Sequence, residues 1–214
     1  MVIAIDGPGG VGKSTVARGV AAALDASYLN TGAYYRAATI AALDAGAAFD
    51  DPPAVIAAVE AAEFAFVDEC MLLDGRDVSD RSRSPEVTGA VSVVSAIPGV
   101  RTLMVRYQRE WVAAHDGHAV VEGRDIGTVV FPDAAVKVFL TASEAERARR
   151  RSGDREAEGQ DVGSIADALR RRDHIDSSRE ISPLSAAEDA VTIDTTSYDA
   201  DSVIGIVLDL VDPA

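Results

Sequence analysis

The sequence predicts an α/β fold in which helices cover a parallel sheet. Three observations support this prediction. Short apolar runs typical of buried strands alternate along the chain with longer segments of helical periodicity. The first apolar run, 2–6, leads through a glycine-rich loop into a helical segment. The 214 residues, 48% of them hydrophobic, suffice for one domain with its own core.

The expected elements follow from apolar spacing and from residues that begin or end helices. The expected strands are the buried apolar runs 2–6, 28–29, 119–121, 136–140 and 191–193. The expected helices are 13–24, 31–45, 52–62, 84–96, 98–115, 142–151, 165–175 and 202–210. Thr31 is a candidate cap for the second helix, Gly46 ends it, and Pro98-Gly99 separates the fourth helix from the fifth. The polar residues 122–125 form a loop between two strands.

Two segments depart from this alternation. Residues 64–67 and 71–73 have strand character and precede an Asp74-Gly75 turn, so a small antiparallel insert is expected there. The polar segment Ser152 to Gly163 is expected to be a mobile loop. We therefore expect a single domain over 1–214, with a core (1–62, 97–146 and 180–214), an insert for the acceptor (about 63–96) and a lid (about 147–179).

Composition excludes several classes of protein. No apolar run approaches the length of a membrane span, and no signal peptide is visible after Met1. The single cysteine excludes a disulfide framework and a cysteine-based zinc site. We expect a cytoplasmic protein with no membrane partner, and a monomer.

The net charge of −15 is unevenly distributed. The stretches 41–70 and 180–214 hold seven and eight acids and no base, which accounts for the whole of that charge. A broad nucleic-acid surface is therefore not expected. The rest of the chain is neutral overall and its cations are clustered, so small phosphate-bearing ligands remain compatible with the sequence.

The glycine-rich loop has the pattern G-x-x-x-x-G-K-[ST] between a strand and a helix. Its residues are Gly7, Pro8, Gly9, Gly10, Val11, Gly12, Lys13, Ser14 and Thr15. Such a loop aims backbone N–H groups and a helix N-terminus at phosphate oxygens. Lys13 would reach the β- and γ-phosphates, and the Ser14 hydroxyl would bind Mg²⁺ together with the phosphates. The sequence therefore predicts a nucleoside triphosphate site, and the short chain without an N-K-x-D motif favours a small-molecule kinase.

Three clusters containing arginine are candidates for the acceptor side. Tyr35 and Arg36 lie on the second helix, and Arg124-Asp125 follows a strand at the ligand-binding edge of the sheet. The third cluster flanks the polar loop and contains Arg147, Arg149, Arg150, Arg151, Arg172, Asp176 and Arg179. Solvated salt bridges on helix faces are the alternative for this third cluster, and packing is the alternative for Tyr35.

Across most of its length the chain resembles bacterial cytidylate kinases, P-loop enzymes that phosphorylate CMP and dCMP with ATP. The matching segments are 5–8, 31–36, 123–134, 143–144, 172–173, 182–184 and 193–196. The block Gly-Arg-Asp followed by Gly-Thr-Val-Val-Phe-Pro is more specific than the P-loop itself. The resemblance implies a P-loop kinase fold with an antiparallel insert and a mobile lid.

The resemblance also implies roles for individual residues. Ser92, Arg101 and Asp125 would lie at the cytosine. Phosphate or base would be contacted by Arg36, Arg124 and Arg179, and the ribose by Arg172 and Asp176; Thr31 and Tyr35 belong to the same acceptor set. Among the lid arginines, Arg147 and Arg151 would join Lys13 in stabilising the transferred phosphoryl group.

Two positions depart from the family pattern. Glu122 stands where Asp is more common, and Asn30 stands where an acid is common. Glu122 keeps its charge and is compatible with a place near Mg²⁺, whereas Asn30 loses it. Other acceptors, such as UMP, shikimate or dephospho-coenzyme A, and a nucleotide-dependent switch remain as alternative functions.

Overall fold

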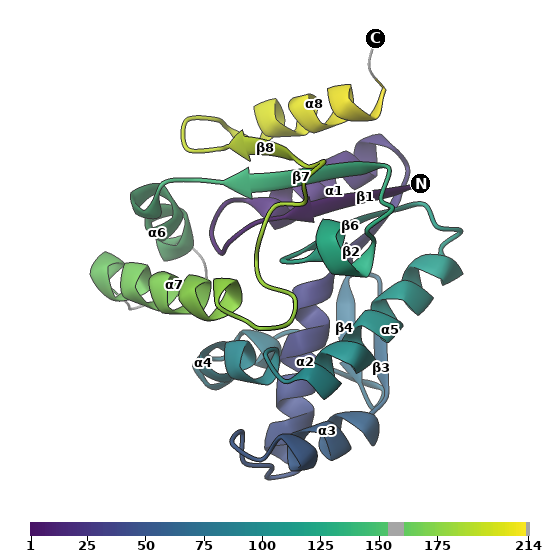
Figure 1. Cartoon of the computed structure of the whole chain (residues 1–214), viewed down its shortest axis with the longest axis vertical. Coiled ribbons are helices and arrows are strands. Elements are labelled where there is room, and N and C mark those ends of the chain that lie inside the picture. Colours follow the sequence, from purple (N-terminus) through teal and green to yellow (C-terminus); the bar gives the residue numbers. More distant parts are fainter. Residues whose placement is uncertain (154–160, 213–214) are drawn as a thin grey trace. The chain divides into compact units, whose positions relative to one another are not determined.

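The computed structural model describes residues 1–153 and 161–212, which form two compact units (Figure 1). Unit 1 comprises Met1–Leu29 and Ala114–Ala214, and unit 2 comprises Asn30–Ala113. The predicted division into core, insert and lid has different boundaries and stays a prediction.

Unit 1 is built on a five-stranded sheet. Its strands are β1 (Val2–Asp6), β2 (Ser27–Asn30), β6 (Ala119–Gly123), β7 (Val136–Thr141) and β8 (Val191–Asp194). Their order is β2-β6-β1-β7-β8, and β1 pairs in parallel with both β6 and β7. This register places Asp6 beside Gly123, so the carboxyl ends of the two strands, and the loops that follow them, meet at one edge. The prediction of a parallel α/β sheet is confirmed.

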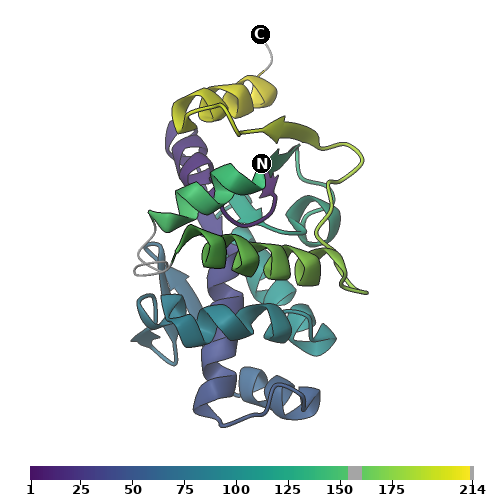
Figure 2. The ribbon, with the colours of Figure 1, turned by 90° about the vertical axis from the view of Figure 1, so that its left-hand side faces the viewer.

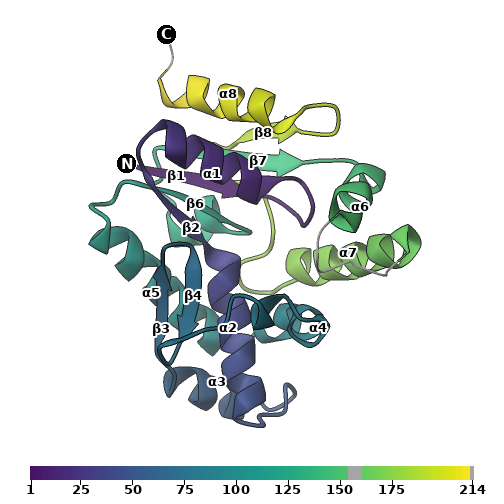
Figure 3. The same ribbon diagram turned by 180° about the vertical axis from the view of Figure 1, so that it is seen from behind.

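Helices α1 (Lys13–Ala23) and α8 (Ala200–Val211) pack together on one face of this sheet (Figure 3). Between them and the strands lies a core of branched aliphatic side chains, among them Ile3, Ile5, Val20, Val138 and Val207. Burying such side chains contributes roughly 1.5–3 kcal/mol each. This core fixes β1 and α1, and therefore the loop between them.

Two further helices of unit 1 lie side by side, α6 (Glu144–Ser152) and α7 (Val162–Ser177) (Figure 2). The predicted mobile loop falls between them, and its residues 154–160 lie outside the described part of the chain. Val162 and Gly163 were expected in that loop but belong to α7, because the Asp161 carboxylate accepts the backbone N–H of Ser164 and caps the helix there.

Among its described elements, unit 2 contains four α-helices, a 3₁₀ helix (Arg81–Arg83) and the small antiparallel sheet. The helices are α2 (Thr31–Asp44), α3 (Pro52–Glu60), α4 (Pro85–Val94) and α5 (Pro98–Ala114). The sheet consists of β3 (Phe64–Val67), β4 (Cys70–Leu73) and β5 (Arg76–Asp77), paired antiparallel, which confirms the predicted insert. Aromatic side chains from the helices and the sheet pack together, with the rings of Phe66 and Trp111 edge to face at 6.0 Å.

Two local predictions are wrong. Thr31 does not cap α2; Asn30 precedes it at the cap position, and Thr31 is the first helical residue. Glu122 and Gly123 are not in a loop, because both belong to β6 and pair with β1.

None of the described helices alone is long and apolar enough to cross a bilayer, although α4 and α5, bent by 102° at their junction, have the length and composition to do so as a pair.

Candidate phosphate-binding and acceptor site

The phosphate loop of unit 1 has the backbone its glycines require. Gly7 has a φ of 147°, and a Cβ there would lie 2.2 Å from the carbonyl oxygen of Leu140. Gly10 has a φ of 80°, and a Cβ would lie 3.0 Å from the carbonyl oxygen of Arg147. Both positions therefore exclude side chains, and the loop backbone packs closely on β7 and α6.

Lys13 is the first residue of α1 and only 7% exposed. Its ammonium donates to the carbonyl oxygen of Pro8 at 2.7 Å, so the side chain folds back over the loop. Burial, Arg124 and Arg172 lower the pKa of Lys13, opposed by Glu122. Cationic side chains therefore converge beside the phosphate loop, an arrangement that anionic ligands stabilise.

The oxygen groups near Ser14 fit a divalent cation. The Tyr28 hydroxyl donates to the Glu122 carboxylate and also interacts with the Ser14 hydroxyl. Burial and Glu122 raise the pKa of Tyr28, so its hydroxyl remains a donor at neutral pH. A hydroxyl and a buried carboxylate are hard oxygen ligands of the kind Mg²⁺ prefers. Within the described residues no group of three or more His, Cys, Asp or Glu side chains could hold a metal by itself.

Arg124, Arg172 and Arg179 surround one carboxylate, that of Asp176. Asp176 is 2% exposed; Arg124 Nε donates to it at 3.0 Å, Arg179 pairs with it, and Arg172 Nε lies 4.0 Å away. Burial raises the pKa of Asp176, but the three guanidinium groups outweigh burial and the net shift is downward. Arg179 lies beyond the end of α7 and still reaches Asp176.

Replacing Asp176 by asparagine should lower the free energy of unfolding by about 3 kcal/mol, because it leaves three guanidinium groups without their buried counter-charge. Urea denaturation at pH 7 measures this loss. The matched control, Asp189→Asn, removes an exposed carboxylate that pairs with Lys137 and should cost less than about 1 kcal/mol. Since the pKa of Asp176 is depressed, the difference from wild type should shrink as the pH falls below about 4. Equal stability of Asp176→Asn and wild type at pH 7 would contradict this account.

Arg147 is 6% exposed and connects α6 to both the phosphate loop and α7. It donates to the carbonyl oxygen of Gly9 at 3.3 Å and forms an ion pair with Asp173. Arg151, the other predicted lid arginine, lies on the last turn of α6 and is partly exposed. The structure therefore brings Arg147 into contact with the phosphate loop.

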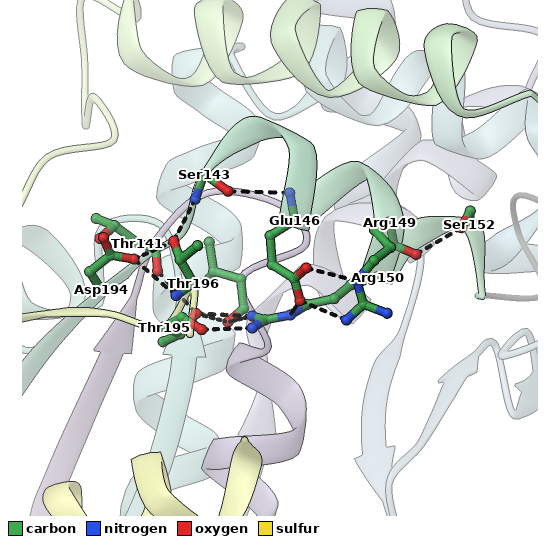
Figure 4. A network of polar contacts seen from close by, with 10 residues as sticks. Thr141, Ser143, Glu146, Arg149, Arg150, Ser152, Asp194, Thr195 and Thr196 are labelled. Atoms are coloured by element: carbon green, nitrogen blue, oxygen red, sulfur yellow. Dashed lines mark hydrogen bonds and ion pairs between the residues drawn. The ribbon is translucent and has the colours of Figure 1, made fainter. Parts of the chain in front are cut away.

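A polar network that sequence reasoning missed holds the other side of the same loop (Figure 4). Arg150 donates to the carbonyl oxygen of Val11 at 3.2 Å and to the Thr195 hydroxyl at 2.9 Å. Thr195 donates to Val11 as well, at 3.1 Å, and Glu146 accepts from the Nε of Arg150. These contacts fix Val11 between α6 and the end of β8. The segment Ile193–Thr196 was singled out in the sequence, but nothing there identified Arg150 as its partner.

In unit 2 the predicted acceptor residues lie on three helices. Arg101, 3% exposed, lies over the ring of Tyr35 with 5.3 Å between its guanidinium carbon and the ring centroid. Arg101 also donates a hydrogen bond to the carbonyl oxygen of Ser95. The Ser95 hydroxyl in turn donates to the carbonyl oxygen of Ser92. Tyr35, Ser92 and Arg101 therefore lie near one another. Arg36 donates a hydrogen bond to the Thr88 hydroxyl at 2.9 Å, and Thr31 is buried at the start of α2.

The last predicted residue, Asp125, directly follows Arg124 at the end of β6 and is 3% exposed. It precedes a π-helical turn over Ile126–Val130 that the sequence did not reveal. The first two N–H groups of this turn donate to the carboxylate of Asp6, each at 2.8 Å. Asp6 was quoted only as part of a motif, yet it anchors the segment that carries Asp125.

Fold and site together define a P-loop kinase: a parallel sheet, a phosphate loop entering α1, and clustered arginines beyond it. Similar folds include a shikimate kinase from Acinetobacter baumannii solved with shikimate (TM-score 0.50, 17% identity, covering 98% of this chain and 92% of that chain) and TT1252 from Thermus thermophilus (TM-score 0.51, 16% identity, 100% and 98%). At such low identity these similarities show the fold alone.

Sequence comparison identifies the family. The model of the cytidylate kinase family matches residues 3–213. The cytidylate kinase of Mycobacterium avium is 50% identical over 218 residues, covering 99% of this chain and 95% of the relative. That of Rhodococcus jostii is 48% identical over 214 residues, covering 97% and 93%. The chain belongs to the cytidylate kinase family.

Proposed function

We propose that this protein transfers the γ-phosphate of ATP to CMP or dCMP, giving ADP and CDP or dCDP. The observation that carries the proposal is the convergence of Lys13 of the phosphate loop with Arg124 and Arg172, predicted to bind the acceptor, within unit 1. Donor and acceptor phosphates repel one another, and clustered cations offset that repulsion. Membership of the cytidylate kinase family supports cytosine as the acceptor base.

The proposed chemistry is an in-line displacement without a covalent enzyme intermediate. An oxygen of the acceptor phosphate attacks the γ-phosphorus of ATP, and the ADP oxygen leaves. That acceptor oxygen is largely deprotonated at neutral pH, so the enzyme needs no strong base. Positioning and charge neutralisation therefore supply the rate enhancement.

Residues of unit 1 have three proposed tasks. The loop from Gly7 to Thr15 binds the ATP phosphates through its backbone, and Lys13 stabilises charge on the transferred group. Arg147 and Arg151 add positive charge from α6. Arg124, Arg172 and Arg179 bind the acceptor phosphate and ribose, with Asp176 holding their guanidinium groups in place and accepting from a ribose hydroxyl.

Mg²⁺ is the proposed metal, and Ser14 would hold it together with the ATP phosphates, with Glu122 nearby. Bound there, the ion would neutralise phosphate charge and help to orient the γ-phosphate. Glu122 is longer than the usual Asp by one methylene group, and the Tyr28 hydroxyl fixes the position of its carboxylate. The residues present therefore suit the metal despite the departure at position 122.

Base recognition is proposed for Ser92, Arg101 and Asp125, with Thr31, Tyr35 and Arg36 completing the acceptor set. Cytosine carries an amino donor at C4 and acceptors at N3 and O2. Asp125 or Ser92 would accept from the amino group, and Arg101 would donate to the ring acceptors. Uracil has a carbonyl at C4, which would face the Asp125 carboxylate without a hydrogen bond.

We propose that the protein acts as a monomer in the cytoplasm, on free nucleotides and without a nucleic-acid polymer as partner. The acidic stretches 41–70 and 180–214 contain none of the proposed site residues, which is consistent with a role in solubility.

A coupled assay of ADP release tests the proposed function. With ATP and Mg²⁺, CMP and dCMP should each support turnover at least about 10-fold faster than UMP, AMP or shikimate at equal subsaturating concentration. Preference for shikimate or AMP would assign another acceptor. ADP release that no acceptor stimulates would favour a nucleotide-dependent switch instead.

A further inference from the structure

Asp6 is a buried carboxylate in unit 1 that holds a segment far away in the sequence. It is the last residue of β1 and is 5% exposed. One carboxylate oxygen accepts the backbone N–H of Ile126 at 2.8 Å, and the other accepts that of Gly127 at 2.8 Å. Both oxygens are therefore engaged by the two residues that directly follow Asp125.

These two N–H groups open the π-helical turn. The turn closes through bonds from the N–H of Val130 to the carbonyl oxygen of Asp125, at 3.2 Å, and from Phe131 to Ile126, at 2.7 Å. The first N–H groups of any helical turn have no partner within it and need an outside acceptor. Asp6 supplies that acceptor from β1 and so fixes where the turn begins.

Burying the Asp6 carboxylate has an electrostatic cost. Burial raises the pKa of Asp6 to about 6, although the N–H groups of Gly127 and Ile126 oppose this shift. As the pH rises from 3.8, the ordinary pKa of an aspartate, through about 6, ionisation of Asp6 therefore lowers the stability of the fold. In return for the buried charge, the fold gains two hydrogen bonds, to the backbone N–H groups of Ile126 and Gly127.

We propose that Asp6 is a positioning residue for the acceptor nucleotide: its carboxylate holds Ile126 and Gly127, and thereby sets where Arg124 and Asp125 present their side chains. The inference rests on the assignment of Arg124 and Asp125 to CMP in the proposed function. Because Asp6 directly precedes Gly7, the rival role is support of the ATP phosphate loop. The two roles predict different kinetic effects.

The substitution Asp6→Asn tests the proposal. Asparagine has the same shape, but its NH₂ group would face one of the two N–H donors, leaving that donor unpaired. We expect the KM for CMP to rise about 10-fold or more, the KM for ATP to change less than about 2-fold, and the preference for CMP over UMP to fall. These constants come from initial rates with each substrate varied in turn.

Two further variants separate the possible causes. Val207→Ala, a deletion in the buried core of unit 1, should lower the Tm without changing either KM. Should Asp6→Asn change only the Tm, or raise the KM for ATP as much as that for CMP, the positioning role is overturned. Asp125→Asn tests the assignment of Asp125 to CMP. If Asp125→Asn leaves CMP recognition unchanged, the proposed acceptor site is wrong. If Asp125→Asn weakens CMP recognition and Asp6→Asn does not, only the role of Asp6 is refuted.

If Asp6→Asn does not fold, a measurement on the wild-type enzyme still tests the proposal. Amide hydrogen exchange at Ile126 and Gly127 should slow about 10-fold or more on binding CMP, and much less on binding a non-hydrolysable ATP analogue, if these N–H groups belong to the acceptor site. The reverse pattern, or no response to CMP, overturns the proposal.

Discussion

The substitution Lys13→Met is expected to lower kcat by about 10³-fold, while the protein remains folded. The side chain is 7% exposed and its ammonium lies against the phosphate loop, 2.7 Å from the carbonyl oxygen of Pro8. In this position it would contact the phosphoryl group as negative charge develops on it. Burial, the largest influence on the pKa of Lys13, disfavours its ammonium form, and methionine is of similar length and uncharged, so the variant should still fold.

The chain offers a matched control for this experiment, because its only other lysine is Lys137. Lys137 pairs with the exposed carboxylate of Asp189 at 2.8 Å and belongs to no proposed site. Lys137→Met should therefore retain the activity of wild type. Coupled ADP release with saturating ATP and CMP compares the two variants, and thermal denaturation checks their folding. Turnover of Lys13→Met within about 3-fold of wild type would show that Lys13 does not act on the transferred group.

The substitution Asp125→Asn is expected to reduce the preference for CMP over UMP by about 10–100-fold in kcat/KM. Asp125 is 3% exposed at the end of β6, where water cannot easily replace a lost partner. A carboxylate only accepts hydrogen bonds, so it matches the amino group of cytosine and opposes the carbonyl of uracil. Asparagine can donate to that carbonyl, so UMP should improve while CMP weakens.

Asp133→Asn is the control for Asp125→Asn, because Asp133 is exposed and follows the same π-helical turn. It should leave both KM values and the base preference unchanged. A large fall in the activity of Asp125→Asn toward CMP and UMP alike would mean that Asp125 supports the site without reading the base.

Much of the fold follows from local patterns in the sequence. The strands β1 and β6 begin as continuous apolar runs because both of their faces are buried in the parallel sheet, and this makes them recognisable. The antiparallel insert was predicted because Asp74-Gly75 marks its turn. Boundaries were less accurate where a polar residue decides them: Asp161 begins α7 earlier than the apolar spacing indicates.

The site was predicted as a set of residues, but its connections were not. The phosphate loop and the Arg124-Asp125 pair are contiguous in the sequence and carry recognisable chemistry. The contacts of Asp6 with Ile126, of Tyr28 with Glu122 and of Arg150 with Val11 join residues 120, 94 and 139 positions apart. No local periodicity encodes such pairs. Each pair depends on the order and register of the strands in the sheet, because these decide which strand ends lie next to one another. The π-helical turn was missed for the same reason, since its hydrogen-bond acceptor lies on another strand.

A competition reaction tests the central claim most directly. Wild-type enzyme receives ATP, Mg²⁺ and equal concentrations of CMP and UMP in one tube, and the initial ratio of CDP to UDP gives the ratio of the two kcat/KM values. Cytosine recognition by the Asp125 carboxylate predicts at least about 10-fold more CDP than UDP. Equal amounts of the two diphosphates, or an excess of UDP, would contradict it.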